Sequence, residues 1–292
     1  MTQQTLDALA RSSGGFAMVA MDQRESLRGM LAEHRDSAVP DGELVRFKLD
    51  VAREVAPHGS GFLIDRHFGF DRVAKDGLLP EGCGLILAAD ALTHTVPGGP
   101  VADTALDPAV DPVAARGDGA AALKLLVIWR ADDERDRRIA MSAEFVRSCE
   151  AAGLVSVLEA VVRPEEVADH DAALIEAATE LGALRPNLYK AQVPGFGRGD
   201  AHAAARTCEK VTAAVPGPWV VLSQGVRIED FPASVELACR AGASGFLAGR
   251  AVWSDTLGAA DWVPLLRERS VPRLRRLADI VDAHARPWQE AR

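Results

Sequence analysis

Residues 187–194, NLYKAQVP, form a short and mostly apolar stretch that contains a single charged side chain, Lys190. Turn-prone dipeptides flank it, RP at 185–186 and PG at 194–195, and this pattern predicts a β-strand. A lysine inside a strand is unusual, because a buried ammonium loses its hydration. Two interpretations are open: the amine reaches water from an edge strand, or burial keeps it neutral and nucleophilic.

Seven further apolar runs lie along the chain, and most end in a charged residue or glycine. Such continuous runs are typical of strands buried on both faces of a parallel sheet. The seven runs are 16–21, 61–64, 84–89, 122–129, 154–162, 219–222 and 245–248. Helical patterns separate most of them, at 41–56, 133–152, 165–181, 200–214 and 228–241, with a short helix at the N-terminus and a last one at 271–285.

Eight strands that alternate with helices predict parallel βαβ units. The fold we expect is a (β/α)8 TIM barrel, with a doubly wound open sheet as the alternative. The chain has 292 residues, and we expect a single (β/α)8 barrel domain over residues 1–292. Residues 93–112 are rich in Pro, Gly and Asp, and we expect them to form a long loop.

Composition narrows the class of protein. The net charge is −9 without a long basic run, which argues against a nucleic-acid partner. No stretch of about 18 apolar residues suggests a membrane span, so a cytoplasmic location is the default expectation. The four cysteines are widely spaced and include no CxxC, so we expect neither a disulfide framework nor a zinc site.

Three ionisable side chains lie inside the predicted fourth, fifth and sixth strands: Lys124, Glu159 and Lys190. Adjacent strands are about 4.8 Å apart, so the three can meet if they face the lumen at similar height. Two lysines and a carboxylate suit Schiff-base chemistry, because a second cation lowers the pKa of the nucleophilic lysine and the carboxylate transfers protons. The alternative is that Lys124 and Glu159 form a buried structural ion pair.

The predicted seventh and eighth strands end in candidate phosphate-binding residues: Ser223, Gly225, Gly249 and Arg250. Glycines let backbone N–H groups approach an anion, and barrels commonly bind phosphate with these two loops. An arginine can add a bidentate contact. The alternative is that the glycines mark ordinary tight turns.

Five motifs carry a resemblance to a known family: GGFAMVAMDQRE at 14–25, KLLVIWR at 124–130, LVSVLEAVVRP at 154–164, LYK at 188–190 and GFLAGRAVW at 245–253. They resemble the class I aldolases of the tagatose-1,6-bisphosphate aldolase family, and within it most closely the sulfofructosephosphate aldolases of sulfoglycolysis. The resemblance spans about residues 13–283. It implies that Lys190 is the Schiff-base lysine, assisted by Glu159 and Lys124. Gln192 and Gln224 depart from the family pattern.

The resemblance implies reversible cleavage of 6-deoxy-6-sulfofructose 1-phosphate to dihydroxyacetone phosphate and 3-sulfolactaldehyde. It implies no metal and no cofactor, and a homo-oligomer. Tagatose or fructose 1,6-bisphosphate is the alternative substrate. A non-catalytic sugar-phosphate-binding regulator is the alternative of another class, but binding alone needs no buried nucleophile.

The remaining candidate residues would hold the rest of the substrate. Asp22 would bind substrate hydroxyls, or else cap the next helix. Gln23 and Arg24 would lie nearest the distal anion, and Asp65 at the second strand end is a further substrate-binding candidate. Three more side chains could reach that anion: His67, Arg130 and Arg163. For the two arginines the alternative is a surface salt bridge with a neighbour such as Asp132 or Glu165.

Overall fold

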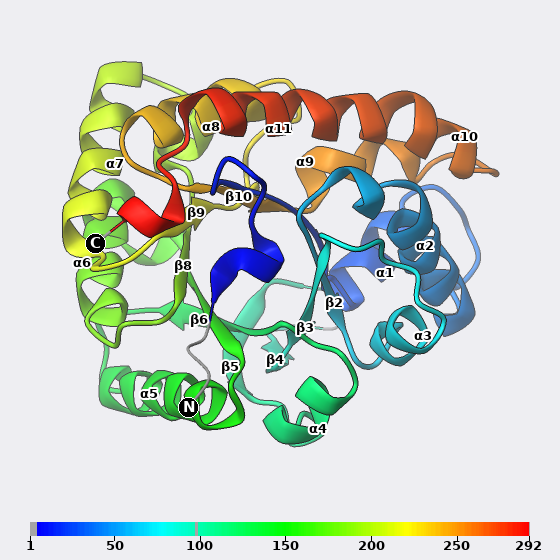
Figure 1. Ribbon diagram of the computed structural model, residues 1–292, viewed down its shortest axis with the longest axis horizontal. Helices are drawn as coiled ribbons and strands as arrows, with labels where there is room; N and C mark the ends of the chain where they lie inside the picture. Colours follow the sequence, from blue (N-terminus) through cyan, green and yellow to red (C-terminus); the bar gives the residue numbers. More distant parts are fainter. Residues whose placement is uncertain (1–4, 97–98, 292) are drawn as a thin grey trace.

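The computed structural model describes residues 5–96 and 99–291, and its centre is a closed barrel of parallel strands surrounded by helices (Figure 1). The strands stand around the barrel in chain order, and β1 closes it by pairing with β10 on one side and β2 on the other. This closure confirms the (β/α)8 TIM barrel and excludes the open sheet. The barrel strands are β1 (Phe16–Met21), β2 (Gly61–Asp65), β3 (Gly84–Ala88), β6 (Ala122–Trp129), β7 (Val155–Val162), β8 (Leu188–Ala191), β9 (Trp219–Val221) and β10 (Gly245–Ala248).

Helices cover the outside of the barrel, and α11 runs beside α8 across one side of it (Figure 1). Six of them, α2, α5, α6, α7, α8 and α11, confirm the helical patterns predicted after the first strand. The α-helices are α1 (Glu25–Ala32), α2 (Asp41–Glu54), α3 (Phe70–Lys75), α4 (Pro112–Gly117), α5 (Arg135–Ala152), α6 (His170–Gly182), α7 (Ala201–Ala214), α8 (Phe231–Arg240), α9 (Arg250–Trp253), α10 (Val263–Leu265) and α11 (Val271–His284).

Local capping explains one displaced helix bound and one that agrees with the prediction. The helix expected from residue 165 begins at His170, because Asp169 accepts a hydrogen bond from the backbone N–H of Ala172 and caps the first turn. Helix α5 ends at Gly153, whose left-handed φ of 71° is typical of a helix C-terminus. The expected N-terminal helix is reduced to a 3-10 turn at Leu6–Leu9.

Residues 93–112 are not the long loop that the sequence predicted. Strands β4 (Asp90–His94) and β5 (Val101–Leu106) form an antiparallel hairpin, and α4 begins at Pro112. Residues 97–98, in the Pro- and Gly-rich part of the sequence between the two strands, lie outside the described part of the chain. The hairpin lies next to β6 and stands over the end of the barrel where the pocket described below opens.

The barrel interior changes character along its axis. Its lower part is an apolar cluster that includes Phe16, Met18, Val157 and Val220, and the 3-10 turn at Leu6–Leu9 packs against this cluster. The upper part, toward the C-terminal strand ends, holds charged side chains instead. A well-packed apolar base therefore fixes the strands that present these charges.

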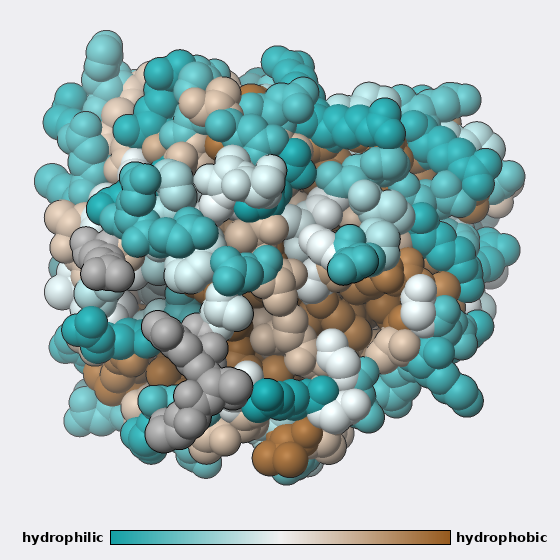
Figure 2. Space-filling model, viewed as in Figure 1, coloured by the Kyte–Doolittle hydropathy of each residue, from teal (hydrophilic) through white to brown (hydrophobic). Residues whose placement is uncertain are grey.

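The outer helices are amphipathic and bury one face against the barrel. Figure 2 shows hydrophilic side chains around the rim of the molecule, including along α11. In the described residues, only Val96 and Val113 are large hydrophobic side chains with high exposure. No helix in the same part of the chain is both long enough and apolar enough to span a membrane.

Candidate active site

A pocket of about 170 Å³ opens at the C-terminal ends of the barrel strands. The hairpin contributes part of its wall, through Leu92, His94 and Val101. The pocket brings together nine of the eleven residues predicted for the site: Asp22, Gln23, Arg24, Lys124, Glu159, Lys190, Ser223, Gly249 and Arg250.

Strand register explains why the three central side chains meet. Glu159 on β7 is directly paired with Lys190 on β8, and Leu126 on β6 is paired with Glu159. Lys124 precedes Leu126 by two residues, so it points to the same face of the strand. The residues two positions before Lys124, Glu159 and Lys190 all belong to the apolar interior cluster, so all three side chains face the lumen.

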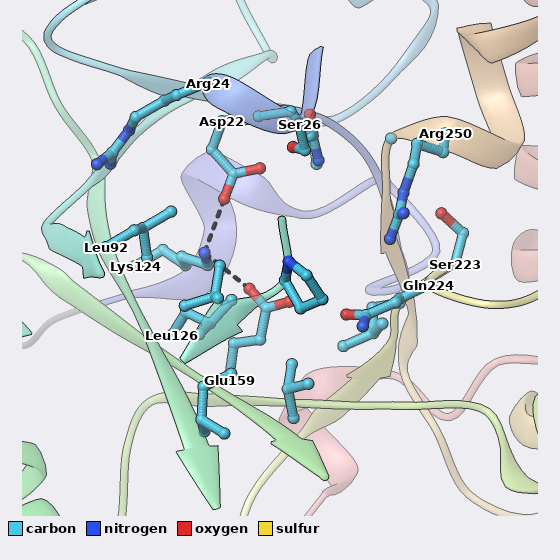
Figure 3. A pocket seen from close by; sticks show the side chains of 18 of the residues that line it. Asp22, Arg24, Ser26, Leu92, Lys124, Leu126, Glu159, Ser223, Gln224 and Arg250 are labelled. Atoms are coloured by element: carbon cyan, nitrogen blue, oxygen red, sulfur yellow. Dashed lines mark hydrogen bonds and ion pairs between the residues drawn. The ribbon is translucent and has the colours of Figure 1, made fainter. Parts of the chain in front are cut away.

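One carboxylate oxygen joins the two lysines. Glu159 Oε2 lies 2.9 Å from Lys124 Nζ and 3.0 Å from Lys190 Nζ. Lys124 Nζ also donates to Asp22 Oδ2 at 2.7 Å, and Figure 3 shows Asp22 and Glu159 directed at it from two sides. Lys124 and Glu159 therefore do form an ion pair, but within a network that includes Lys190 rather than as an isolated structural pair.

The position of β8 decides between the two interpretations of Lys190. The strand lies between β7 and β9, and the lysine is only 3% exposed. The edge-strand interpretation is therefore wrong. The amine lies in the pocket, where it can meet a substrate.

The charges of the cluster set its pKa values. Burial by itself would raise the pKa of Glu159, but Lys124 and Lys190 more than offset this, and the net shift is downward. The pKa of Asp22 is lowered in the same way against the effect of burial. For Lys124, burial acts to lower the pKa, and the surrounding carboxylates raise it well above the usual value. Lys124 is therefore held as an ammonium between ionised carboxylates.

Asp90 is a member of this network that sequence reasoning recognised as a strand-end residue but did not assign to the site. It is 1% exposed, and its Oδ2 accepts from Lys124 Nζ at 3.0 Å and from the backbone N–H of Leu126 at 3.2 Å. Arg24 donates to its Oδ1 at 2.9 Å and to its backbone oxygen at 2.8 Å. The available signal was an acidic residue directly after the apolar run 84–89, but nothing in the sequence distinguished it from the other strand ends.

The opposite side of the pocket offers a cation without a partner. Figure 3 shows Arg250, Ser223 and Gln224 grouped together, across the pocket from Arg24. Among the described residues, nothing accepts a hydrogen bond from the Arg250 guanidinium or forms an ion pair with it. Burial lowers the pKa of Arg250, against the opposing pull of Asp22 and Glu159.

Gly249 shapes the same side of the pocket. A Cβ at this position would lie 2.5 Å from the backbone oxygen of Ala20, so any larger residue would push the loop away from the end of β1. Ser223 Oγ accepts a hydrogen bond from the backbone N–H of Ala251 at 3.4 Å, which links the two loops predicted to bind phosphate.

Two predicted site residues lie elsewhere. Asp65 is fully buried, where it bonds Lys48 from α2 and accepts from the backbone N–H of Phe68 at 2.8 Å. It does not line the pocket, because a helix lysine covers it. Gly225 also does not line the pocket: its φ of 77° forms a turn, and a Cβ there would lie 2.5 Å from the ring of Phe196. The tight-turn alternative therefore applies to Gly225.

The residues considered for the distal anion divide into those inside and outside the pocket. Gln23 lines it, and its buried Oε1 has no hydrogen-bond partner within the described residues. Arg163 also lines it and donates to the backbone oxygen of Val101 at 2.7 Å. Arg130 instead pairs with Glu166 at 2.5 Å, and His67 pairs with Asp107 at 2.8 Å, both outside this pocket.

Known proteins match this chain along most of its length. The family described as "DeoC/LacD family aldolase" matches residues 16–255. Tagatose 1,6-diphosphate aldolase of Staphylococcus aureus (strain MSSA476) is 25% identical over 287 residues, which cover 87% of this chain and 85% of that protein.

Solved structures agree on the fold. A crystal structure of an archaeal fructose 1,6-bisphosphate aldolase has a TM-score of 0.66 and 19% identity, and covers 95% of this chain and 98% of that chain. The fructose-bisphosphate aldolase from Slackia heliotrinireducens DSM 20476 has a TM-score of 0.68 and 17% identity, over 95% and 88% of the two chains.

The family match runs from β1 to beyond α9 and includes every charged residue of the network described above. The chain therefore belongs to the DeoC/LacD family and is a class I aldolase, a lyase.

Proposed function

We propose that this aldolase cleaves 6-deoxy-6-sulfofructose 1-phosphate to dihydroxyacetone phosphate and 3-sulfolactaldehyde, with Lys190 as the Schiff-base residue. The observation that carries the chemistry is the single oxygen of Glu159 that contacts both Lys190 and Lys124, at 3.0 and 2.9 Å. A nucleophilic amine, a proton carrier and a fixed cation are then within one hydrogen bond of each other.

The first half of the reaction builds the iminium. The neutral amine of Lys190 adds to the C2 carbonyl, and the oxygen takes up a proton to give a carbinolamine. Glu159 is the proton shuttle, because it already contacts the amine that loses protons. Loss of the C2 oxygen as water leaves an iminium. The ammonium of Lys124 polarises a substrate oxygen near C2.

The second half breaks the C3–C4 bond. Asp22 is held by Lys124 at the end of β1, where it can bind substrate hydroxyls. When the C4 hydroxyl loses its proton, C4 becomes the aldehyde of sulfolactaldehyde and the bonding electrons move into the iminium to give an enamine. Protonation at C3 and addition of the water released earlier return dihydroxyacetone phosphate and free Lys190, so the reaction consumes nothing beyond the sugar.

The 1-phosphate would bind on the side of Ser223, Gly249 and Arg250. The guanidinium of Arg250 is without a partner among the described residues, and a phosphate dianion supplies one. A cation left unpaired beside an apolar barrel wall is disfavoured, which supports a resident anion at this side.

Replacement of Arg250 by alanine should weaken binding of dihydroxyacetone phosphate by about 1.5–3 kcal/mol, the range for a charge-assisted hydrogen bond. Because the same phosphate anchors the transition state, kcat/KM should fall at least as far. Calorimetry and steady-state kinetics measure the two effects. Arg267→Ala is a matched control, since that arginine is paired with Glu54 on the outer surface. Unchanged phosphate affinity in a folded Arg250→Ala protein would move the phosphate site elsewhere.

The charge balance at the distal end supports a sulfonate. Arg24 is already neutralised by Asp90, and Gln23 offers a neutral amide. Apart from Arg250, which is assigned to the 1-phosphate, Arg163 is the pocket arginine without a carboxylate partner in the part of the chain described. A sulfonate carries one negative charge, whereas a phosphate monoester carries about −1.5 to −2 near neutral pH. One guanidinium and neutral donors suit the monoanion better.

The substrate assignment predicts an order of specificity. The kcat/KM for 6-deoxy-6-sulfofructose 1-phosphate should exceed the values for fructose and tagatose 1,6-bisphosphates, measured by release of dihydroxyacetone phosphate with one enzyme preparation. A preference for either bisphosphate would replace the sulfosugar by that substrate and leave the aldolase chemistry intact. No release from any of the three would favour the regulatory alternative.

A further inference from the structure

We infer that Asp90 is a positioning residue for Lys124, and that Arg24 acts through Asp90 rather than by binding substrate. The inference rests on the proposed function, in which Lys124 assists Lys190. It assigns roles that are absent from the chemistry described so far, because neither Asp90 nor Arg24 contacts the nucleophile or its proton carrier in any hydrogen bond or ion pair of the described residues.

Asp90 joins three parts of the molecule. It is the first residue of β4, so its backbone begins the hairpin that walls the pocket. Its carboxylate reaches Lys124 on β6, and Arg24 binds both this carboxylate and the backbone oxygen of the same residue. With a contact to the N–H of Leu126 as well, the side chain has little rotational freedom.

The pattern of contacts requires a carboxylate at this position. Asp90 accepts from a guanidinium on one oxygen and from an ammonium and a backbone N–H on the other. An asparagine of the same shape has one acceptor oxygen and one NH2 group. In either orientation, its NH2 would face a cation, Arg24 or Lys124, and a buried donor would lose its acceptor.

The charges around Lys124 make it sensitive to Asp90. Three carboxylates contact Lys124 directly: Asp22 after β1, Asp90 on β4 and Glu159 on β7. Each of them also interacts with a further cation. Lys190 on β8 contacts Glu159, Arg24 contacts Asp90, and the charges of Lys48 and Arg250 act on Asp22. Removal of the Asp90 charge takes away one of three contacting anions and leaves Arg24 as an uncompensated like charge. Both changes disfavour the ammonium form of Lys124.

This network also distinguishes two roles for Arg24. If Arg24 bound the distal anion, its loss would harm substrates that carry this anion more than those that lack it. If it acts through Asp90, its loss should reduce kcat by the same factor for both kinds of substrate. Fructose 1-phosphate, which has no charge at C6, and fructose 1,6-bisphosphate form a suitable pair.

The test compares Asp90→Asn, Asp90→Glu and Arg24→Gln with the wild-type enzyme, by pH profiles of kcat/KM. Asp90→Asn should lower kcat/KM about 10²-fold, the scale for a misplaced catalytic group. Its alkaline limb should move to lower pH, because Lys124 loses its proton more easily. Asp90→Glu keeps the charge, so its alkaline limb should stay near that of the wild type. Arg24→Gln should give equal losses on the two fructose phosphates, and it keeps the inference testable if Asp90→Asn does not fold.

Controls separate this inference from the function on which it rests. Asp103→Asn alters a carboxylate of the same hairpin that pairs with the exposed Arg137, and it should leave the kinetics and the pH profile unchanged. Borohydride trapping with dihydroxyacetone phosphate should label Lys190 in the wild type. If the label forms while Asp90→Asn keeps wild-type kinetics and pH profile, or Arg24→Gln selectively harms the bisphosphate, the inference is overturned. If the wild type gives no label on Lys190, the proposed function fails and the inference fails with it.

Discussion

Replacement of Lys190 by methionine should lower kcat by roughly 10⁴-fold or more, because Lys124, the other lysine that lines the pocket, is held as an ammonium and does not replace the nucleophile. Methionine matches the length of the lysine stem and suits the apolar layer below, formed in part by Leu188 and Val220. The barrel should therefore fold, and Glu159 should keep its contact with Lys124. The measurement is single-turnover cleavage of the preferred substrate.

Covalent trapping makes the same test independent of the substrate's identity. Borohydride with dihydroxyacetone phosphate should leave one stable secondary amine on Lys190 in the wild type and none in Lys190→Met. Lys210→Met is a matched control, because that lysine is exposed on α7 and should leave both turnover and trapping intact. An adduct mapped to Lys124 would exchange the roles of the two lysines.

The barrel was predictable because its signal is repeated along the chain. Each strand is buried on nearly every residue, so the strands read as continuous apolar runs, and the alternation with helices allows few topologies. The hairpin of β4 and β5 was missed for the opposite reason. Its strands are only partly buried and carry Asp and Thr residues, so they lack the apolar run that identifies the other strands.

The centre of the site was predictable from strand geometry alone. Side chains alternate along a strand, so Glu159 and its partner Lys190 face the lumen together. Lys124 lies two residues before the β6 partner of Glu159 and therefore on the same face. For Asp65 the same reasoning gave a wrong prediction. It also follows an apolar run, but Lys48 from α2 covers it, and no pattern within either segment reveals that contact.

The contact between Asp90 and Arg24 is a second interaction that the sequence did not predict. Sequence reasoning assigned Arg24 to the distal anion because the end of the first strand faces the sixth strand across the lumen. The guanidinium of Arg24, which follows β1, instead pairs with Asp90, which follows β3 and lies 66 residues away in the sequence. Pairings between loops of different strands depend on side-chain rotamers and local backbone direction, which a single sequence does not contain.

Replacement of Glu159 by glutamine should lower kcat about 10²- to 10⁴-fold, the range for loss of a general acid–base. The amide cannot carry protons, and it removes the negative charge that both lysines now contact through one oxygen. The step most affected should be formation of the carbinolamine and its dehydration. The rate of borohydride trapping with dihydroxyacetone phosphate should therefore fall, whereas the affinity for the phosphate should change little, because Arg250 lies on the other side of the pocket (Figure 3).

The pH dependence separates a proton shuttle from a structural carboxylate. Since the two lysines hold the pKa of Glu159 below its usual value, the group stays ionised as the pH falls to the ordinary carboxylate range. In the wild type, the acid limb of kcat that reports Glu159 should therefore lie below that range, and Glu159→Gln should remove this limb. Glu166→Gln is the matched control, because that carboxylate pairs with Arg130 outside the pocket. If Glu159→Gln keeps the acid limb and the trapping rate, proton transfer must pass through Asp22, a second ionised carboxylate of the pocket, which shares Lys124 with Glu159.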